Sequence, residues 1–175
     1  NLHRKGLALS SGLGAVIVLA LAVRSAAQVP IWRTSLSVWQ HCLALNPNNA
    51  RAHDLVGDHS ARIGQWREAQ SHYETVLKLR PYAIETLKNY GYCLSSWEPE
   101  MRDYDRAVEL MNRAYVATEG KLPDVVASLS DVHGSYAFHL QQTRQYARAI
   151  EEYRRALEVD PSHTAAPGSP DYFEK

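Results

Sequence analysis

The eight histidines are the residues of this 175-residue sequence that could most readily hold a metal ion. His53 and His59 lie six residues apart, so on a helix their side chains point about 240° away from each other and cannot share an ion. No two histidines have the i, i+3 or i, i+4 spacing that places two ligands on one helical face, and no His–Cys–His set occurs. The sequence therefore predicts no metal site.

Neighbouring acidic residues could act as a general acid and a general base. Such pairs include Glu98/Glu100, Asp103/Asp105 and Glu151/Glu152. These pairs fall in predicted loops or at exposed helix positions, where a solvated surface explains them better. Phosphate-binding glycine loops and a nucleophile elbow are absent from the sequence. Cys42 and Cys93 are predicted to be core residues of helices that are not neighbours, so we expect no disulfide. No catalytic residue and no cofactor are predicted.

Charge is distributed unevenly along the chain, although Lys+Arg and Asp+Glu both number 19. The zero net charge argues against a nucleic-acid-binding protein, which normally carries a basic surface. No acidic residue precedes Asp54, whereas five of the Lys and Arg residues do, so residues 1–53 carry +5 and residues 54–175 carry −5.

The basic part contains an uncharged apolar run at residues 6–23. Eighteen residues of helix span roughly 27 Å, enough for the hydrocarbon core of a bilayer. We predict a transmembrane helix at residues 6–24 with lipid around it, after residues 1–5 as the flank of a truncated parent. A signal peptide and a buried soluble helix are the alternatives. The basic residues on the two sides balance, so charge does not decide the orientation.

An internal repeat follows the apolar run. Ala69, Ala107 and Ala149 each precede a large residue four positions later and a small or medium one three positions after that, which places all of them on one helical face. The intervals between the alanines are 38 and 42 residues, and an earlier copy begins at Ser35, 34 residues before Ala69. Gly57 lies in the predicted partner helix. It is predicted to let that helix approach its neighbour at Ala69 closely, because a glycine within a helix otherwise costs about 1 kcal/mol.

The repeat resembles the tetratricopeptide repeat (TPR), a helix–turn–helix unit of 34 residues. The first unit fits at Gly57, Ala69, Tyr73 and Pro81, and the second at Gly91, Ala107 and Ala114. A four-residue insertion near Trp97 lengthens the second unit. In the third unit, either Gly134 or Ala137 could occupy the small-residue position of the first helix. An unrelated helical bundle is the alternative.

The predicted fold is therefore all-α: an antiparallel helix-hairpin TPR solenoid of about three and a half units, preceded by one transmembrane helix. Residues 25–47 are expected to form a linker and a capping helix at 31–45, equal to half a repeat. Residues 48–161 would form three TPR hairpins, and residues 162–175 a flexible tail. One hairpin cannot bury its apolar face alone, so the units must stack.

The first helix of each TPR unit is expected to line a concave groove that binds a protein or an extended peptide. The exposed candidates are Arg51, Asp54, Asp58, Arg62, Glu85, Lys88, Tyr92 and Ser96. The alternative for each is a solvated helix face. TPR domains that clamp a C-terminal carboxylate need Lys and Asn where this chain has Asp54 and Asp58, so that function is not expected.

The junction between the apolar run and the repeats resembles a second, narrower family. Arg24, Trp32, Ser35 and Trp39, followed by the segment 46–53, are similar to the residues after the last membrane helix of transmembrane-and-TPR (TMTC-type) proteins. That resemblance implies a parent that is a dolichyl-phosphate-mannose-dependent protein O-mannosyltransferase. It also implies that the repeats lie in the lumen of the endoplasmic reticulum and engage the acceptor protein. The family's catalytic acidic residues have no counterpart in this chain.

Two functions therefore remain after the sequence analysis. One is the acceptor-engaging C-terminal region of a membrane O-mannosyltransferase. The other is a membrane-tethered, non-enzymatic TPR adaptor that assembles proteins. The sequence that precedes Asn1 would distinguish them, since further apolar spans would favour the enzyme.

Overall fold

A computed structural model describes residues 16–27, 29, 34–97, 99 and 102–162. The regular elements of these residues are helices, and no strand occurs among them, which confirms the all-α prediction. The chain divides into two compact units, Asn1–Ala52 and His53–Lys175, which we describe separately.

In the first unit, residues 16–27 form a helix, and its large apolar side chains between Val16 and Val23 are 51–66% exposed. Among the residues that the structure describes, no helix is both long enough and apolar enough to cross a membrane. Residues 1–5 and the first part of the predicted span, residues 6–15, lie outside the described residues. The transmembrane helix thus stays a prediction.

Helix α2 (Ser35–Leu45) forms the second helix of this unit. Its first turn has a reciprocal cap: the Thr34 hydroxyl accepts a hydrogen bond from the Ser37 amide, and the Ser37 hydroxyl accepts one from the Thr34 amide. The sequence predicted a helix over 31–45, and residues 31–33 of that range lie outside the described residues. Helix α3 (Ala50–Arg62) begins in the first unit and continues into the second.

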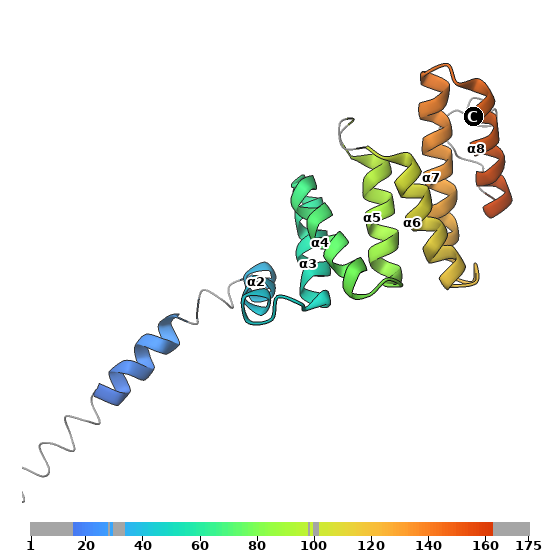
Figure 1. Cartoon of the computed structure of the whole chain (residues 1–175). Helices are drawn as coiled ribbons and strands as arrows, with labels where there is room; N and C mark the ends of the chain where they lie inside the picture. Colours follow the sequence, from blue (N-terminus) through green and yellow to red (C-terminus); the bar gives the residue numbers. More distant parts are fainter. Residues whose placement is uncertain (1–15, 28, 30–33, 98, 100–101, 163–175) are drawn as a thin grey trace, which may run out of the picture. The chain divides into compact units, whose positions relative to one another are not determined.

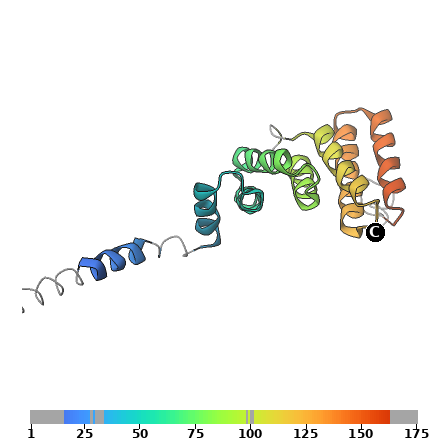
Figure 2. The same ribbon diagram turned by 60° about the horizontal axis from the view of Figure 1, so that its bottom comes forward.

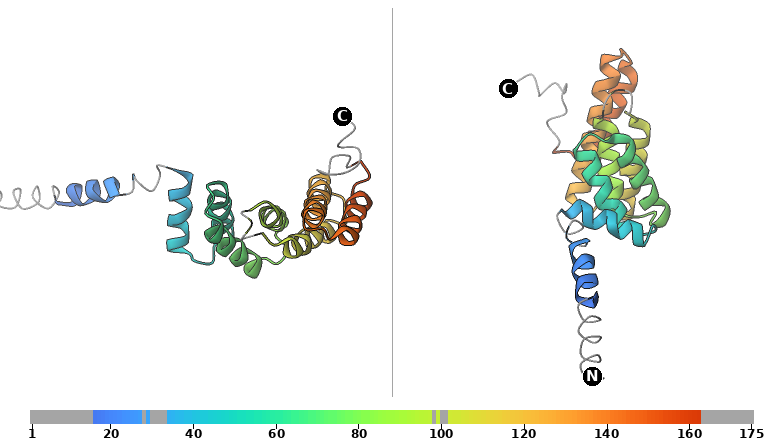
Figure 3. Two further views of the ribbon diagram at one scale, coloured as in Figure 1. Left: turned by 90° about the horizontal axis from the view of Figure 1, so that it is seen from above. Right: turned by 90° about the vertical axis from the view of Figure 1, so that its left-hand side faces the viewer.

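The second unit is built from helices that follow one another in chain order (Figures 1 and 2). They are the rest of α3, α4 (Trp66–Leu79), α5 (Ile84–Ser96), α6 (Tyr104–Ala117), α7 (Pro123–Gln142) and α8 (Tyr146–Val159). Helices α5 and α6, and likewise α7 and α8, run side by side as antiparallel hairpins, as further views show (Figure 3). We call them the second and third hairpins. Helices α3 and α4, which meet where Gly57 and Asp58 contact Tyr73, are the first hairpin. Residues 163–175, most of the predicted tail, lie outside the described residues.

The small residues that defined the repeat lie in the core of this unit. Ala69, Ala107 and Ala149 are 0%, 0% and 3% exposed. A row of aromatic rings joins the first two hairpins: Tyr73 stacks on Tyr90 at 5.4 Å, and Trp97 lies 6.1 Å from Tyr90 and 5.6 Å from the Trp66 ring. The inserted loop after α5 thus contributes a buried tryptophan to the core instead of projecting into solvent.

The two repeat glycines lie where helices approach closely. A methyl group added at Gly57 would lie 3.1 Å from the Tyr73 ring and 3.2 Å from Cβ of His72. At Gly91 it would lie 3.0 Å from Cγ of Met111 and 3.1 Å from the Ala107 carbonyl oxygen. The close approach confirms the prediction, with one change: Gly57 makes room for Tyr73 and His72 on α4 rather than for Ala69.

The turns of the first and third hairpins are the same structure. In the first, the Gln65 amide donates to the Ser60 carbonyl and Gly64 has a φ of 77°. In the third, the Gln145 amide donates to the Leu140 carbonyl and Arg144 has a φ of 61°. Both are Schellman caps, in which a residue in the left-handed region ends the helix.

This equivalence determines which residue of α7 occupies the small-residue position of the third hairpin. Each residue of its turn lies eighty positions after the matching residue of the first turn. Ala137, which is fully buried, therefore occupies the position that Gly57 has in the first hairpin, and Gly134 does not.

Candidate functional site

The predicted groove residues fall into an exposed group and a buried group. Arg51, Arg62, Glu85, Tyr92 and Ser96 are exposed. Tyr92 is the only aromatic among the eight candidates, and it is 56% exposed. Arg51 belongs to the first unit and is therefore not part of the surface described below. That surface is formed by α5 and α7, which are adjacent helices of the second unit.

The prediction of an exposed position is wrong for Asp54, which is 7% exposed. Its carboxylate accepts a hydrogen bond of 2.7 Å from the Thr86 hydroxyl on α5. Asp58 is half-buried, and its Oδ1 atom accepts hydrogen bonds from the Tyr73 hydroxyl at 2.8 Å and from the Asn89 amide at 3.1 Å. Both aspartates therefore connect the first hairpin to its neighbours through hydrogen bonds, and their carboxylates are engaged in doing so.

Lys88 also links two helices. Its ammonium nitrogen lies 2.5 Å from Asp124 on α7 and 3.0 Å from Glu85 on its own helix. The hydrogen bond to Asp124 raises the pKa of Lys88 more than desolvation lowers it, and it lowers the pKa of Asp124. This ion pair fixes the spacing of the two first helices, α5 and α7.

The sequence did not predict that α7 contributes to this surface, because it left open whether Gly134 or Ala137 occupies the small-residue position of that helix. With Ala137 in the position of Gly91, Phe138 on α7 is the counterpart of Tyr92 on α5. Phe138 is 38% exposed, so each of the two adjacent first helices presents a partly or largely exposed aromatic ring at the same repeat position. The twelve-residue spacing from Ala137 to Ala149, equal to that from Gly57 to Ala69, was the signal that could have identified it.

A polar cavity of about 730 Å³ lies elsewhere in the second unit, and none of the eight predicted residues lines it. It is bounded by the middle of α4, the ends of α5 and α7, and the starts of α6 and α8. Its lining residues are Gln70, Glu74, Tyr90, Leu94, Arg102, Asp103, Tyr104, Asp105, Arg106, Tyr136, His139, Leu140, Gln145 and Arg148. Charges of both signs are present, so the cavity has no strong preference for an anion or a cation.

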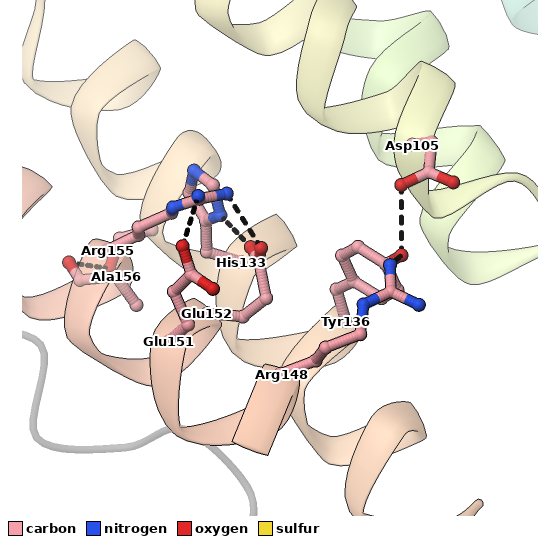
Figure 4. Close-up of polar contacts among 9 residues, drawn as sticks. Asp105, His133, Tyr136, Arg148, Glu151, Glu152, Arg155 and Ala156 are labelled. Carbon is pink, nitrogen blue, oxygen red and sulfur yellow. Dashed lines mark hydrogen bonds and ion pairs between the residues drawn. The ribbon is translucent and has the colours of Figure 1, made fainter. Parts of the chain in front are cut away.

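The polar groups at the α7 side of the cavity are held by one another (Figure 4). Arg148 donates a hydrogen bond of 2.7 Å to the Tyr136 hydroxyl, which in turn donates one of 2.9 Å to Asp105. The Tyr104 ring stacks on Tyr136 with centroids 5.0 Å apart and planes inclined by 6°. Burial and the Asp105 carboxylate raise the pKa of Tyr136, so this phenol stays protonated at neutral pH. The arrangement is a fixed network that joins α6, α7 and α8, with no activated nucleophile.

A second polar cluster lies between α7 and α8 (Figure 4). His133 Nδ1 lies 2.7 Å from Oε2 of Glu152, and the two side chains are only 4% and 10% exposed. Arg155 donates to Oε1 of Glu152 at 2.8 Å. The Ser130 hydroxyl donates to the Ala156 carbonyl at 2.9 Å. Because both carboxylate oxygens of Glu152 are engaged, this cluster is a packing element of the third hairpin rather than a proton-transfer site.

Metal and thiol chemistry receive no support from the part of the chain that the structure describes. Within it, no group of three or more His, Cys, Asp or Glu residues could hold a metal ion. Cys42 and Cys93 are free cysteines, and burial raises the pKa of Cys93 to about 11. A thiol with so high a pKa is a poor nucleophile at neutral pH, since the thiolate is the reactive form.

Comparison with known proteins supports a repeat architecture. The family model described as a tetratricopeptide repeat matches residues 136–163, which include the end of α7 and all of α8. A crystal structure of MamA superposes with a TM-score of 0.54 at 18% identity, covering 75% of this chain and 70% of that one. A structure of MamA MSR-1 C2 gives a TM-score of 0.53 at 16% identity, covering 72% and 66%. No curated protein gives a significant match to the sequence.

The sequence match and the structural likeness agree with the geometry described above. The matched segment contains Ala137, Ala149 and Pro161 at the TPR spacing, and the three-dimensional likeness extends over most of the chain. At these identities the structural likeness concerns the fold alone. The chain therefore contains a tetratricopeptide repeat at residues 136–163, within a helical-hairpin fold similar to that of MamA.

Proposed function

We propose that the second unit is a protein-interaction module whose first helices α5 and α7 bind an extended peptide or a segment of a partner protein. The observation that carries this proposal is the pair of exposed aromatic rings, Tyr92 and Phe138, at equivalent positions of two adjacent helices. Large aromatic residues contribute much of the binding free energy in protein interfaces. The Lys88–Asp124 ion pair also links these two helices.

The binding surface can be tested without knowing the natural partner. Peptides selected from a random phage-displayed library against the full chain in detergent micelles should bind the unaltered protein. Tyr92→Ala combined with Phe138→Ala should weaken these peptides about tenfold or more, since each aromatic residue of a binding hot spot contributes about 1–2 kcal/mol. Tyr82→Ala is the matched control, because Tyr82 is a 73% exposed aromatic residue in the turn before α5. Equal affinities for the double variant and the control would contradict the proposal.

We further propose that residues 6–24 anchor the module to a membrane. The support is the uncharged apolar run and the exposed apolar side chains of its described part, residues 16–23. The full chain should float with phosphatidylcholine vesicles in a density gradient. Val16→Lys combined with Val18→Lys should leave it at the bottom, because charged residues near the centre of a span cost several kcal/mol. Flotation of this variant would contradict membrane anchoring through the segment.

The finer proposal is that this module is the acceptor-engaging region of a TMTC-like O-mannosyltransferase, with its repeats in the lumen of the endoplasmic reticulum. Its support is the resemblance of the junction between residues 24 and 53. The chain has no Asn-x-Ser/Thr sequon, so Glu119→Asn with Lys121→Thr would introduce a single one in an exposed turn. Asparagine suits position 119, where φ is 52°.

Glycosylation of that sequon in cells would support the lumenal placement, and an unmodified chain would contradict it. The enzymatic part has its own test, which is transfer of mannose from dolichyl-phosphate mannose by the polypeptide that carries this region. If the parent binds an acceptor through Tyr92 and Phe138 but transfers no mannose, the adaptor function is favoured.

A further inference from the structure

The second helix of each hairpin carries a row of positions that face the next hairpin. Counted from the small residue of the repeat, these positions lie three before, one after and eight after it. They are Trp66, Gln70 and Leu77 on α4, and Tyr104, Val108 and Tyr115 on α6. All of these except Gln70 are hydrophobic residues that pack, partly buried, against the core of the second unit.

In both hairpins, the first residue of this row stacks on an aromatic ring from the element that follows. Trp66 lies against Trp97, at the end of α5, with ring centroids 5.6 Å apart. Tyr104 lies against Tyr136 of α7 at 5.0 Å. The starts of α4 and α6 are therefore covered by an aromatic residue that lies directly after α5 or in the C-terminal half of α7.

The third hairpin has the same row, but it is exposed. The equivalent residues on α8 are Tyr146, Ile150 and Leu157, which we call the α8 stripe. They are 59%, 53% and 51% exposed. Three large apolar side chains at helical spacing on one face are more typical of an interface than of a solvated surface.

Residues 163–175 do not have the apolar spacing of a further first helix. Helix α5 begins three residues after Pro81 and buries Leu87, Tyr90 and Leu94. Counted in the same way from Pro161, the corresponding residues are Pro167, Pro170 and Glu174. Proline within a helix breaks the hydrogen-bond ladder, and glutamate cannot replace a buried leucine. The sequence of this segment therefore does not provide a further first helix.

We propose that the α8 stripe binds an amphipathic helix of a partner protein, which runs antiparallel to α8. The pattern required of that helix follows from the two internal interfaces that the stripe continues. Helix α5 buries Leu87, Tyr90 and Leu94, with Trp97 beyond, and the equivalent buried residues of α7 are His133, Tyr136 and Leu140. The partner helix thus has large residues at i, i+3 and i+7, of which the last two are apolar or aromatic, and an aromatic residue in its C-terminal half that stacks on Tyr146.

This surface is separate from the face that carries Tyr92 and Phe138, so the two proposals can fail independently. It is also separate from the α7 contacts of α8, because the residues that face α7, Ala149 and Ala156, are buried within the hairpin. A substitution in the stripe should therefore leave the third hairpin folded.

A peptide with the sequence of residues 84–97, labelled with fluorescein and carrying Cys93→Ser, is a suitable probe because it is the helix that covers α4. Titrated with the full chain in detergent micelles, it should bind saturably, as followed by fluorescence anisotropy. Ile150→Glu and Leu157→Glu should each weaken binding at least tenfold, with unchanged helicity by circular dichroism. A peptide that also carries Trp97→Ala should bind the unaltered chain more weakly, because it lacks the ring that stacks on Tyr146.

The control is Val116→Glu, which places the same charge at a 72% exposed apolar residue of α6 outside the stripe. It should leave the affinity unchanged. Absence of saturable binding, or binding that Ile150→Glu and Leu157→Glu do not alter, would overturn the proposal. Sedimentation that shows the unaltered chain to self-associate, and Ile150→Glu to prevent this, would also overturn it, since the occupant would then be a second copy.

Discussion

The first and third hairpins have the same backbone turn and place a polar pair at the same position, yet the two pairs differ in chemistry. In the first, His53 and His72 bring their Nδ1 atoms to 2.8 Å. In the third, His133 and Glu152 lie 2.7 Å apart at the same sequence separation of 19 residues. One histidine must donate and the other accept in the first pair, so that pair requires a neutral ring, whereas a carboxylate accepts from either form of the ring.

The second hairpin shows that the position does not need a polar pair. Its equivalent residues, Leu87 and Leu110, are fully buried. This position of a hairpin can thus hold two buried apolar side chains, two histidines or a histidine and a glutamate. The position requires two side chains that complement each other in volume and hydrogen bonding, and the three solutions differ in their sensitivity to mutation and to pH.

The largest effect is expected when one member of the buried His133–Glu152 pair is removed. Glu152→Leu leaves His133 buried beside an apolar side chain and should lower the free energy of unfolding by about 3–5 kcal/mol. Chemical denaturation followed by circular dichroism measures this loss.

The double variant His133→Leu with Glu152→Leu reproduces the pair of the second hairpin and serves as the matched comparison. Replacement of a buried ion pair by apolar residues is often neutral or stabilising, so its stability should lie within about 1 kcal/mol of the unaltered protein or above it. A double variant as unstable as Glu152→Leu would show that the three hairpins do not have interchangeable solutions at this position.

A somewhat smaller loss is expected from the apolar pair. Leu87→Ala removes buried methyl groups and leaves a cavity, which should cost about 2–4 kcal/mol in the same denaturation experiment. Leu157→Ala is the control, because Leu157 is 51% exposed. Similar losses from the two variants would contradict the assignment of Leu87 to the core.

The turns of the two similar hairpins allow a stabilising change. Arg144 has a φ of 61° where the first hairpin has Gly64, and a non-glycine residue in this region is disfavoured by roughly 1 kcal/mol. Arg144→Gly should therefore raise the melting temperature slightly. The reverse substitution, Gly64→Arg, should lower it, and an unchanged melting temperature in both variants would contradict the equivalence of the turns.

The smallest effect concerns pH. Desolvation and the neighbouring His53 lower the pKa of His72 below 6.5, and Glu68 only partly opposes this. The unfolded chain then binds the proton more readily than the folded one, so the stability that this group contributes above pH 6.5 is lost as the pH falls through the lowered pKa.

Amide hydrogen exchange in α3 and α4 should therefore accelerate between pH 7.5 and pH 5, after correction for intrinsic rates. Helices α5 and α6 provide the internal control, because their equivalent pair is Leu87 and Leu110. An equal change in both hairpins would contradict a local origin at His72.

Local spacing predicted the helical hairpins, and long-range contacts corrected the candidate site. Gly57, Ala69 and Pro81 recur at fixed intervals that only paired helices explain, and the structure contains those helices. Asp54 was predicted to be exposed because its helix was considered alone. Its carboxylate is instead buried against Thr86 of the next hairpin, 32 residues away, and no periodicity within one helix reports such a contact.

The sequence by itself determined the class of the fold, because helix periodicity, small residues at helix contacts and prolines at helix ends all act over a few residues. Tertiary structure decided which polar residues remain available for a partner. It assigned Ala137 its register, brought Tyr92 and Phe138 to equivalent positions on adjacent helices, and left the α8 stripe exposed. The physical reason is that the exposure of a side chain depends on what packs across from it, and in a stacked array that neighbour lies in another repeat.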